Sequence, residues 1–207
     1  MITSCKLTGN PASISAYHTK EENYYFSQAS GSDGPSQLDP ARSHVRIHGK
    51  LAGQLGLTPG GEISQQAFTN ILSGKDAAGN KVCREHKVMG IDLTFSAHKS
   101  VSVAALVTLR DQRIIAAHDQ AVLETMREIE AQHAATQGPG RPSPCVMTGN
   151  LAYVTARDGF SREHDPHLHT HVVVMNLTAM GEKIMALDGR EIMVRDFKAS
   201  LLPLAKV

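Results

Sequence analysis

The sequence predicts an α+β fold in which helices flank a central antiparallel sheet of about five strands. Two observations lead to this prediction. Alternating or continuously apolar segments typical of strands cluster at 90–96, 145–155, 168–177 and 183–187. A long helical pattern with apolar residues along one side lies between the first two of them, at 111–136. With 207 residues the chain is long enough for one well-buried core, so residues 1–207 are expected to form a single domain.

Further helices are expected before and after the first strand. Asn10 followed by Pro11 is typical of a helix start, which predicts a short helix at 13–20. Helical patterns also occupy 41–55 and 64–72, and small residues after the first strand favour a buried helix. The stretch 28–40 is rich in Gly, Ser, Asp and Pro and predicts a mobile loop.

The composition is that of a soluble globular protein, with 41% hydrophobic residues and a net charge of +1. No apolar run approaches the roughly 18 residues of a membrane span, so no membrane insertion is expected. Three widely spaced cysteines outside any CxxC pattern suit reduced thiols and a cytoplasmic location. The net charge neither indicates nor excludes nucleic acid, because a basic face can exist on a nearly neutral protein.

The segment HDPHLHTHVVVMN, 164–176, concentrates histidines at the start of an apolar strand. Side chains alternate between the faces of a strand, so His169 and His171 project together and can chelate one divalent ion. His164 and His167 lie just upstream. The alternative is a pair of histidines hydrogen-bonded within a core, and a metal site also needs a third ligand from elsewhere.

Three of the four tyrosines lie in AYHTKEENYYF, 16–26. If this segment is helical, Tyr17 and Tyr24 share a face, about 10 Å apart along the axis. Aromatic residues at this spacing often pack in a core, but the residues around these are polar. A tyrosine beside a metal ion is instead a candidate nucleophile that attacks a phosphate and forms a covalent phosphotyrosine.

Three segments carry a family resemblance, namely AYHTKEENYY (16–25), GIDLTFSAHKSVS (90–102) and TGNLAYVTARDGFSREHDPHLHTHVVVMN (148–176). They resemble the tyrosine pairs, the Asp-Leu-Thr-Phe-Ser-Ala-x-Lys-Ser-Val-Ser block and the metal-binding strand of MobF-class conjugative relaxases, in the HUH endonuclease superfamily. The order of the segments is also that of the family, and the resemblance covers nearly the whole chain.

The resemblance implies a metal-dependent, site- and strand-specific nickase that cleaves single-stranded DNA at a plasmid transfer origin and so starts conjugative transfer. Tyr17 matches the first nucleophile, which leaves a 5′-phosphotyrosine, and Tyr24 or Tyr25 matches the tyrosine of a later strand transfer. Asp92 matches an acidic residue that orients a metal histidine or helps to deprotonate the tyrosine. Other relaxosome proteins and a coupling protein are the implied protein partners in the bacterial cytoplasm.

The sequence departs from the family pattern at the metal site. The family's first metal histidine lies thirteen residues before the last, and the corresponding residue here, counted back from His171, is Asp158. Either Asp158 replaces that imidazole, or His164 or His167 takes its place, or metal binding is weakened. A carboxylate ligand favours Mg²⁺ or Mn²⁺ over softer ions.

Two other departures concern the tyrosine pair and the chain length. His18 stands where the first pair normally has a second tyrosine, which leaves Tyr17 as the nucleophile. Relaxase domains of the family continue well past 207 residues, so the domain is expected to lack its C-terminal part.

Three hypotheses from different classes follow. The first is an active relaxase, in which Lys99, Arg157 and Arg162 are candidate phosphate contacts. The second is a truncated remnant that binds single-stranded DNA without cleaving it, so that neither a chelator nor Tyr17→Phe changes its affinity. The third is a metallohydrolase that acts through metal-bound water, whose turnover survives Tyr17→Phe without any protein–DNA adduct.

Overall fold

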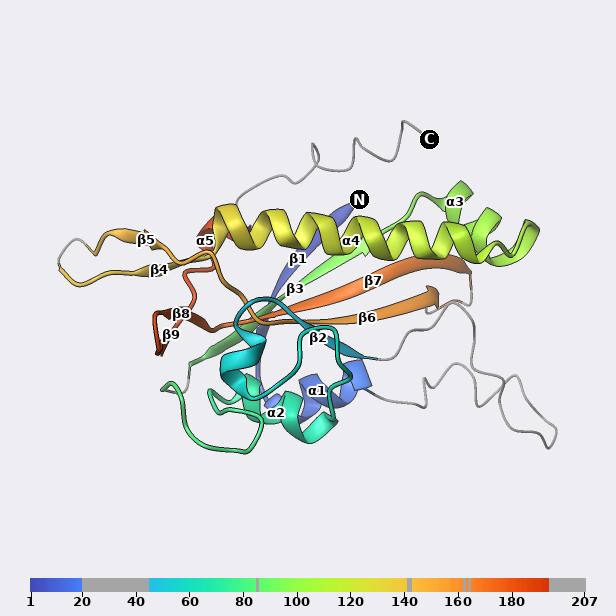
Figure 1. The fold of residues 1–207 in the computed structure, drawn as a ribbon. Helices are drawn as coiled ribbons and strands as arrows, with labels where there is room; N and C mark the ends of the chain where they lie inside the picture. Colours follow the sequence, from blue (N-terminus) through green and yellow to red (C-terminus); the bar gives the residue numbers. More distant parts are fainter. Residues whose placement is uncertain (20–44, 85, 141–142, 162, 164, 194–207) are drawn as a thin grey trace.

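The computed structural model describes residues 1–19, 45–84, 86–140, 143–161, 163 and 165–193. The expected mobile loop at 28–40 lies outside these residues. A five-stranded sheet forms the centre of the described molecule, and every neighbouring pair of its strands is antiparallel (Figure 1). In spatial order its strands are β1 (Ile2–Thr8), β3 (Val88–Ser96), β7 (Pro166–Met175), β6 (Tyr153–Phe160) and β2 (Arg46–His48).

Helices cover both faces of this sheet (Figure 1). The long helix α4 (Gln112–His133) crosses one face, whereas α1 (Pro11–Thr19) and α2 (Gln65–Leu72) lie against the other. Strand β7 contributes to both cores, because Val172 and Val174 pack on the α4 side and Val173 packs on the α2 side. The valine run is therefore buried from both directions, as expected for a central strand.

Smaller elements complete the described chain. After β3 the chain forms α3, which runs directly into the π-helical turn η2, and two short hairpins lie beside the main sheet. These elements are η1 (Ala52–Leu55), α3 (Lys99–Val103), η2 (Ala104–Thr108), β4 (Ala135–Gln137), β5 (Cys145–Met147), β8 (Thr178–Met180), β9 (Lys183–Met185) and α5 (Arg190–Met193). None of the described helices is long and apolar enough to span a membrane.

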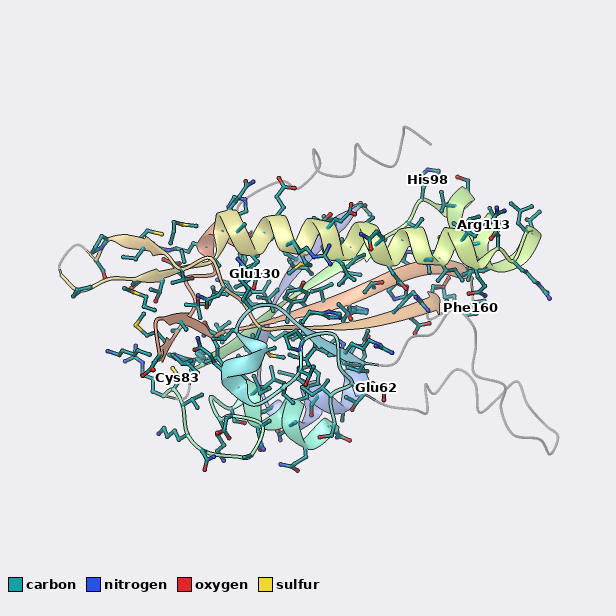
Figure 2. All side chains as sticks on the ribbon, viewed as in Figure 1. Glu62, Cys83, His98, Arg113, Glu130 and Phe160 are labelled. Atoms are coloured by element: carbon teal, nitrogen blue, oxygen red, sulfur yellow. The ribbon has the colours of Figure 1, made fainter. Side chains whose placement is uncertain are left out.

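The helix starts follow the sequence signals. The Asn10 side chain accepts a hydrogen bond from the Ala12 amide at 2.9 Å, which caps the start of α1. Asp111 caps α4 in the same way, through the amide of Arg113 at 2.9 Å. Glu130 lies on α4 (Figure 2) and is 4% exposed. Its Oε1 accepts hydrogen bonds from the backbone amides of Lys50 and Leu151.

The α+β prediction is confirmed, but several element boundaries are wrong. The helix expected over 41–55 is, within the described residues, strand β2 followed by the 3-10 helix η1. Gly49 separates them with a φ of +93°, a conformation that interrupts a helix. The strand expected over 145–155 is two strands, because residues 148–152 leave the β4–β5 ribbon before β6 begins. Strand β1 was not predicted, since most of its residues are exposed.

Candidate functional site

The sheet face that α1 covers carries polar side chains from the three central strands, β3, β7 and β6. Across β3 and β7, Thr94 lies opposite His171, and across β6 and β7, Asp158 lies opposite His169. Strand alternation puts these side chains on the same face as Asp92, away from α4. The predicted pairing of His169 with His171 is seen directly, since their ring centroids are 5.3 Å apart.

Hydrogen bonds fix the orientation of both imidazoles. The Nδ1 of His169 lies 2.7 Å from the His167 carbonyl, and the Nδ1 of His171 lies 2.9 Å from Asp92 Oδ2. Both oxygens can only accept, so each Nδ1 carries the hydrogen and each neutral ring keeps its lone pair on Nε2. This is the arrangement in which outer oxygens prepare histidines to bind a metal ion.

A third metal donor is less well prepared. Asp158 is the direct cross-strand neighbour of His169, but its Oδ1 accepts the Phe160 amide at 3.2 Å. His167 stacks on His169 with ring centroids 4.7 Å apart, and His164 lies outside the described residues. Among the side chains that the structure describes, no three His, Cys, Asp or Glu groups gather in a metal-binding arrangement. Two of the described side chains, His169 and His171, are therefore oriented to bind a metal ion. A third ligand requires another side chain to move.

Tyr17 is the tyrosine that the structure places at this site. It lies on α1 with 58% of its surface exposed, and its ring meets that of His171 edge-on at 6.2 Å between centroids. A phenol in this position is accessible to a ligand lying over the histidine pair. Tyr24 and Tyr25 lie outside the described residues, so their expected role stays a prediction.

A third histidine, His18, is buried beside the histidine pair. His18 is 8% exposed, and its ring lies 5.4 Å from that of His171. Burial lowers the pKa of His18 to about 4, although the negative charge of Asp92 acts in the opposite direction. Burial likewise lowers the pKa of His169. The sequence identified His18 only as a replacement for a tyrosine, because its contact with the sheet depends on how α1 packs.

The predicted phosphate contacts occupy different places. Arg157 points to the opposite face of the sheet and forms an ion pair with Asp119 of α4. With its side chain 10% exposed, it serves the packing of α4 and is poorly placed for a phosphate near His169. Lys99 is exposed at the start of α3, with Nζ 3.6 Å from a carboxylate oxygen of Asp165. Arg162 lies outside the described residues.

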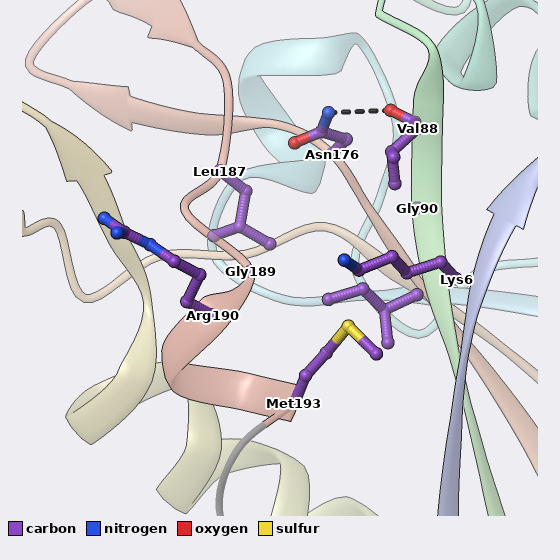
Figure 3. Close-up of a pocket in the computed structure, with 9 residues that line it drawn as sticks. Lys6, Val88, Gly90, Asn176, Leu187, Gly189, Arg190 and Met193 are labelled. Carbon is purple, nitrogen blue, oxygen red and sulfur yellow. Dashed lines mark hydrogen bonds between the residues drawn. The ribbon is translucent and has the colours of Figure 1, made fainter.

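A separate cavity of about 320 Å³ lies near the first residues of β3 (Figure 3). Lys6, Asn176 and Met193 are among the residues that line it, and most of its lining is apolar. The histidine pair lies beside Thr94 and Ser96, at the other end of the strand. This cavity is therefore distinct from the site beneath α1.

Comparisons with known proteins identify the family of this chain. The TrwC relaxase family profile matches residues 12–202. The chain is 33% identical over 205 residues to the multifunctional conjugation protein TraI of Escherichia coli, and 36% identical over 168 residues to TraI of Escherichia coli strain K12. These alignments cover 96% and 78% of the chain, but only 11% and 9% of the two TraI proteins.

Solved relaxase structures share the fold. The metal-bound structure of the conjugative relaxase TrwC with oriT DNA superposes with a TM-score of 0.75 at 33% identity. The superposition covers 93% of this chain and 63% of that one. A complex of TrwC with a 27-mer DNA that comprises the recognition hairpin and the cleavage site gives a TM-score of 0.71 at 31% identity, over 93% and 61% of the two chains. The chain whose exposed Tyr17 faces an oriented histidine pair therefore belongs to the TrwC relaxase family.

Proposed function

We propose that this chain nicks one DNA strand at a plasmid transfer origin, with Tyr17 as the nucleophile. The observation that carries this proposal is the position of the exposed Tyr17 ring, edge-on to His171 within a face that also holds His169 and Asp92. Similar relaxases have been solved in complex with origin DNA, which supports the same class of substrate here.

The reaction exchanges one phosphodiester bond for another. The Tyr17 oxygen attacks the scissile phosphorus and loses its proton, and the bond from phosphorus to the 3′ oxygen breaks. The products are a 5′-phosphotyrosine and a free 3′-hydroxyl. Because the phosphotyrosine bond retains the energy of the phosphodiester, rejoining needs no ATP. Tyr24 or Tyr25 serves the second strand transfer.

His169 and His171 would hold a divalent ion in this proposal, since their Nε2 lone pairs are available, and Asp158 would be the third ligand. A divalent ion held there, Mg²⁺ or Mn²⁺, would neutralise charge on the phosphate and stabilise the transition state. Asp92 keeps the Nδ1 hydrogen of His171 in place and so keeps Nε2 available.

The proposed substrate is single-stranded DNA, and the proposed setting is the bacterial cytoplasm. Other relaxosome proteins and a coupling protein are the partners that this function requires. Lys99 is exposed near the N-terminal end of β7 and is a proposed phosphate contact together with Arg162. Because the net charge is only +1, binding is expected to be modest and to weaken steeply with salt.

A second function is favoured by one observation. Asp158 stands where the family has its first metal histidine, and its Oδ1 accepts the Phe160 amide at 3.2 Å. If Asp158 does not turn toward His169, the chain binds single-stranded DNA at its origin without cleaving it.

Covalent trapping separates these functions. Labelled single-stranded oligonucleotides that tile the transfer origin are incubated with the protein and Mn²⁺, then run on a denaturing gel. We expect a shifted band that disappears in Tyr17→Phe. Tyr153→Phe is the matched control, because Tyr153 is 3% exposed in the core on the α4 side. Binding without a band supports the non-cleaving protein, and turnover that survives Tyr17→Phe without a band supports the metallohydrolase.

A further inference from the structure

His18 lies on the buried face of α1, three residues after the buried Ser15. It follows Tyr17 on α1, yet Tyr17 is 58% exposed and His18 is 8% exposed. The His18 ring lies between Phe68 of α2, at 6.3 Å between centroids, and His171 of β7, at 5.4 Å. A polar ring is therefore buried between an apolar core and the oriented histidine pair, where it requires a hydrogen-bond partner.

One oxygen of the Asp92 carboxylate also requires a hydrogen-bond partner, as an acceptor that needs a donor. Its Oδ2 accepts the Nδ1–H of His171 at 2.9 Å, but its Oδ1 is buried and has no hydrogen-bond partner among the described residues. A buried acceptor of this kind destabilises the folded protein when it stays unpaired, and more so when it is charged.

The other neighbours of Asp92 do not meet this requirement. On β7 the residue opposite Asp92 is Val173, which has no side-chain donor. On β1 it is Cys5, whose thiol instead lies 3.6 Å from the carbonyl oxygen of Lys6. Thr94 lies 3.3 Å from His171 Nδ1. His18 is the described residue that combines burial, an N–H donor and contact with the same His171 ring.

We propose that His18 is a positioning residue, whose ring turns so that its imidazole N–H donates to Asp92 Oδ1, the buried acceptor that no described group reaches in the structure. Asp92 is then held at both oxygens, by His18 on one side and by His171 on the other. A carboxylate fixed in this way cannot rotate away from His171, so the His171 ring keeps its Nδ1–H tautomer and the direction of its Nε2 lone pair. The value of this arrangement for metal binding rests on the proposed function, whereas the contact itself does not.

A double-mutant cycle on the metal-free protein tests the contact. The unfolding equilibrium constant is measured in urea for the wild type, His18→Phe, Asp92→Ala and the double variant. The phenyl ring changes the packing in both backgrounds, so this effect cancels in the cycle. We expect a coupling of about tenfold or more between the two positions, typical of a hydrogen bond to a charged group. An equal effect of His18→Phe in both backgrounds overturns the proposal.

A second measurement follows the His171 tautomer in protein that carries ¹⁵N-labelled histidine. We expect the Nδ1–H form in the wild type and in His18→Gln, which retains a donor, and a mixture of tautomers in His18→Phe. A tautomer that is the same in all three proteins overturns the positioning role, because a purely structural role would leave it unchanged.

Titration with Mn²⁺ alone separates this inference from the proposed function. We expect His18→Phe to bind Mn²⁺ about tenfold more weakly than the wild type and His18→Gln to bind nearly as well. If the wild-type protein shows the coupling of His18 with Asp92 and the Nδ1–H form of His171 but does not bind Mn²⁺, the proposed metal site is contradicted. The His18–Asp92 contact is then supported on its own. Equal Mn²⁺ affinity in the wild type and His18→Phe counts against the positioning role.

Discussion

Glu130 is predicted to be the main polar link between α4 and the loops around β2 and β6. Its Oε1 accepts the amide of Lys50 at 2.8 Å and the amide of Leu151 at 2.8 Å. Leu151 is fully buried, so Glu130→Ala leaves its amide without an acceptor and without water. One buried unpaired amide at about 1–3 kcal/mol, the lost bond to the amide of the exposed Lys50 at about 1 kcal/mol, and a small cavity give an expected loss of about 2–5 kcal/mol of unfolding free energy.

Urea unfolding followed by far-UV circular dichroism measures this loss. Glu130→Gln keeps an oxygen acceptor without the charge and is expected to lose about half as much, since charge-assisted hydrogen bonds are about twice as strong as neutral ones. Glu128→Ala is the matched control on the exposed side of the same helix, and its effect is expected within about 0.5 kcal/mol. If Glu130→Ala loses no more than Glu128→Ala, the account of this link is refuted.

Three further predictions concern pH, backbone and metal binding. Burial holds the pKa of His118 at about 4, below about 6.5 in the unfolded chain, so the unfolded chain binds the proton first and stability falls between pH 6.5 and 4. In urea unfolding across this window, His118→Gln is expected to reduce the loss of stability by about 3 kcal/mol. Gly49→Ala lowers the thermal midpoint, because φ is +93° and a Cβ would lie 2.2 Å from the Leu151 carbonyl oxygen; we expect a loss above about 2 kcal/mol. Asp158→Ala weakens Mn²⁺ binding about tenfold or more in calorimetric titration, because it removes the proposed third ligand.

Each of these predictions has a contrary outcome. An unchanged pH profile in His118→Gln places the acid sensitivity elsewhere. Gly53→Ala is the backbone control, since nothing lies within 4 Å of its added Cβ; an equal loss in both glycine variants contradicts the steric argument. Unaltered Mn²⁺ affinity in Asp158→Ala shows that another group completes the metal site.

Strand periodicity explains how much of the site the sequence could predict. Alternation alone places His169 and His171 on one face, and the valine run after them marks a strand buried on both sides. The same alternation places Arg157 and Asp158 on opposite faces of the sheet. This follows only when β6 is known to continue to Phe160. The sequence predicts a strand that ends at residue 155, so it does not assign Arg157 to either face of the sheet.

Tertiary packing explains what the sequence could not predict. The burial of His18 depends on α1 lying against α2 and β7, and no local pattern encodes that contact. The N-terminal strand β1 is a largely exposed edge strand with little apolar alternation, so its pairing with β3 was also missed. Residues 45–55 have a helical apolar spacing, but pairing of β2 with β6 prevails over this local preference.

Peptide mapping of the covalent adduct tests the central claim most directly. Protein trapped on origin DNA is digested with nuclease and trypsin, and the nucleotide-bearing peptide is identified by tandem mass spectrometry. Cleavage after Lys6 and Lys20 isolates Tyr17 in a peptide with no other tyrosine, whereas Tyr24 and Tyr25 fall in the next one. We expect the first nick to leave the nucleotide on the peptide of Tyr17. A nucleotide found only on the next peptide, or on neither, contradicts Tyr17 as the nucleophile.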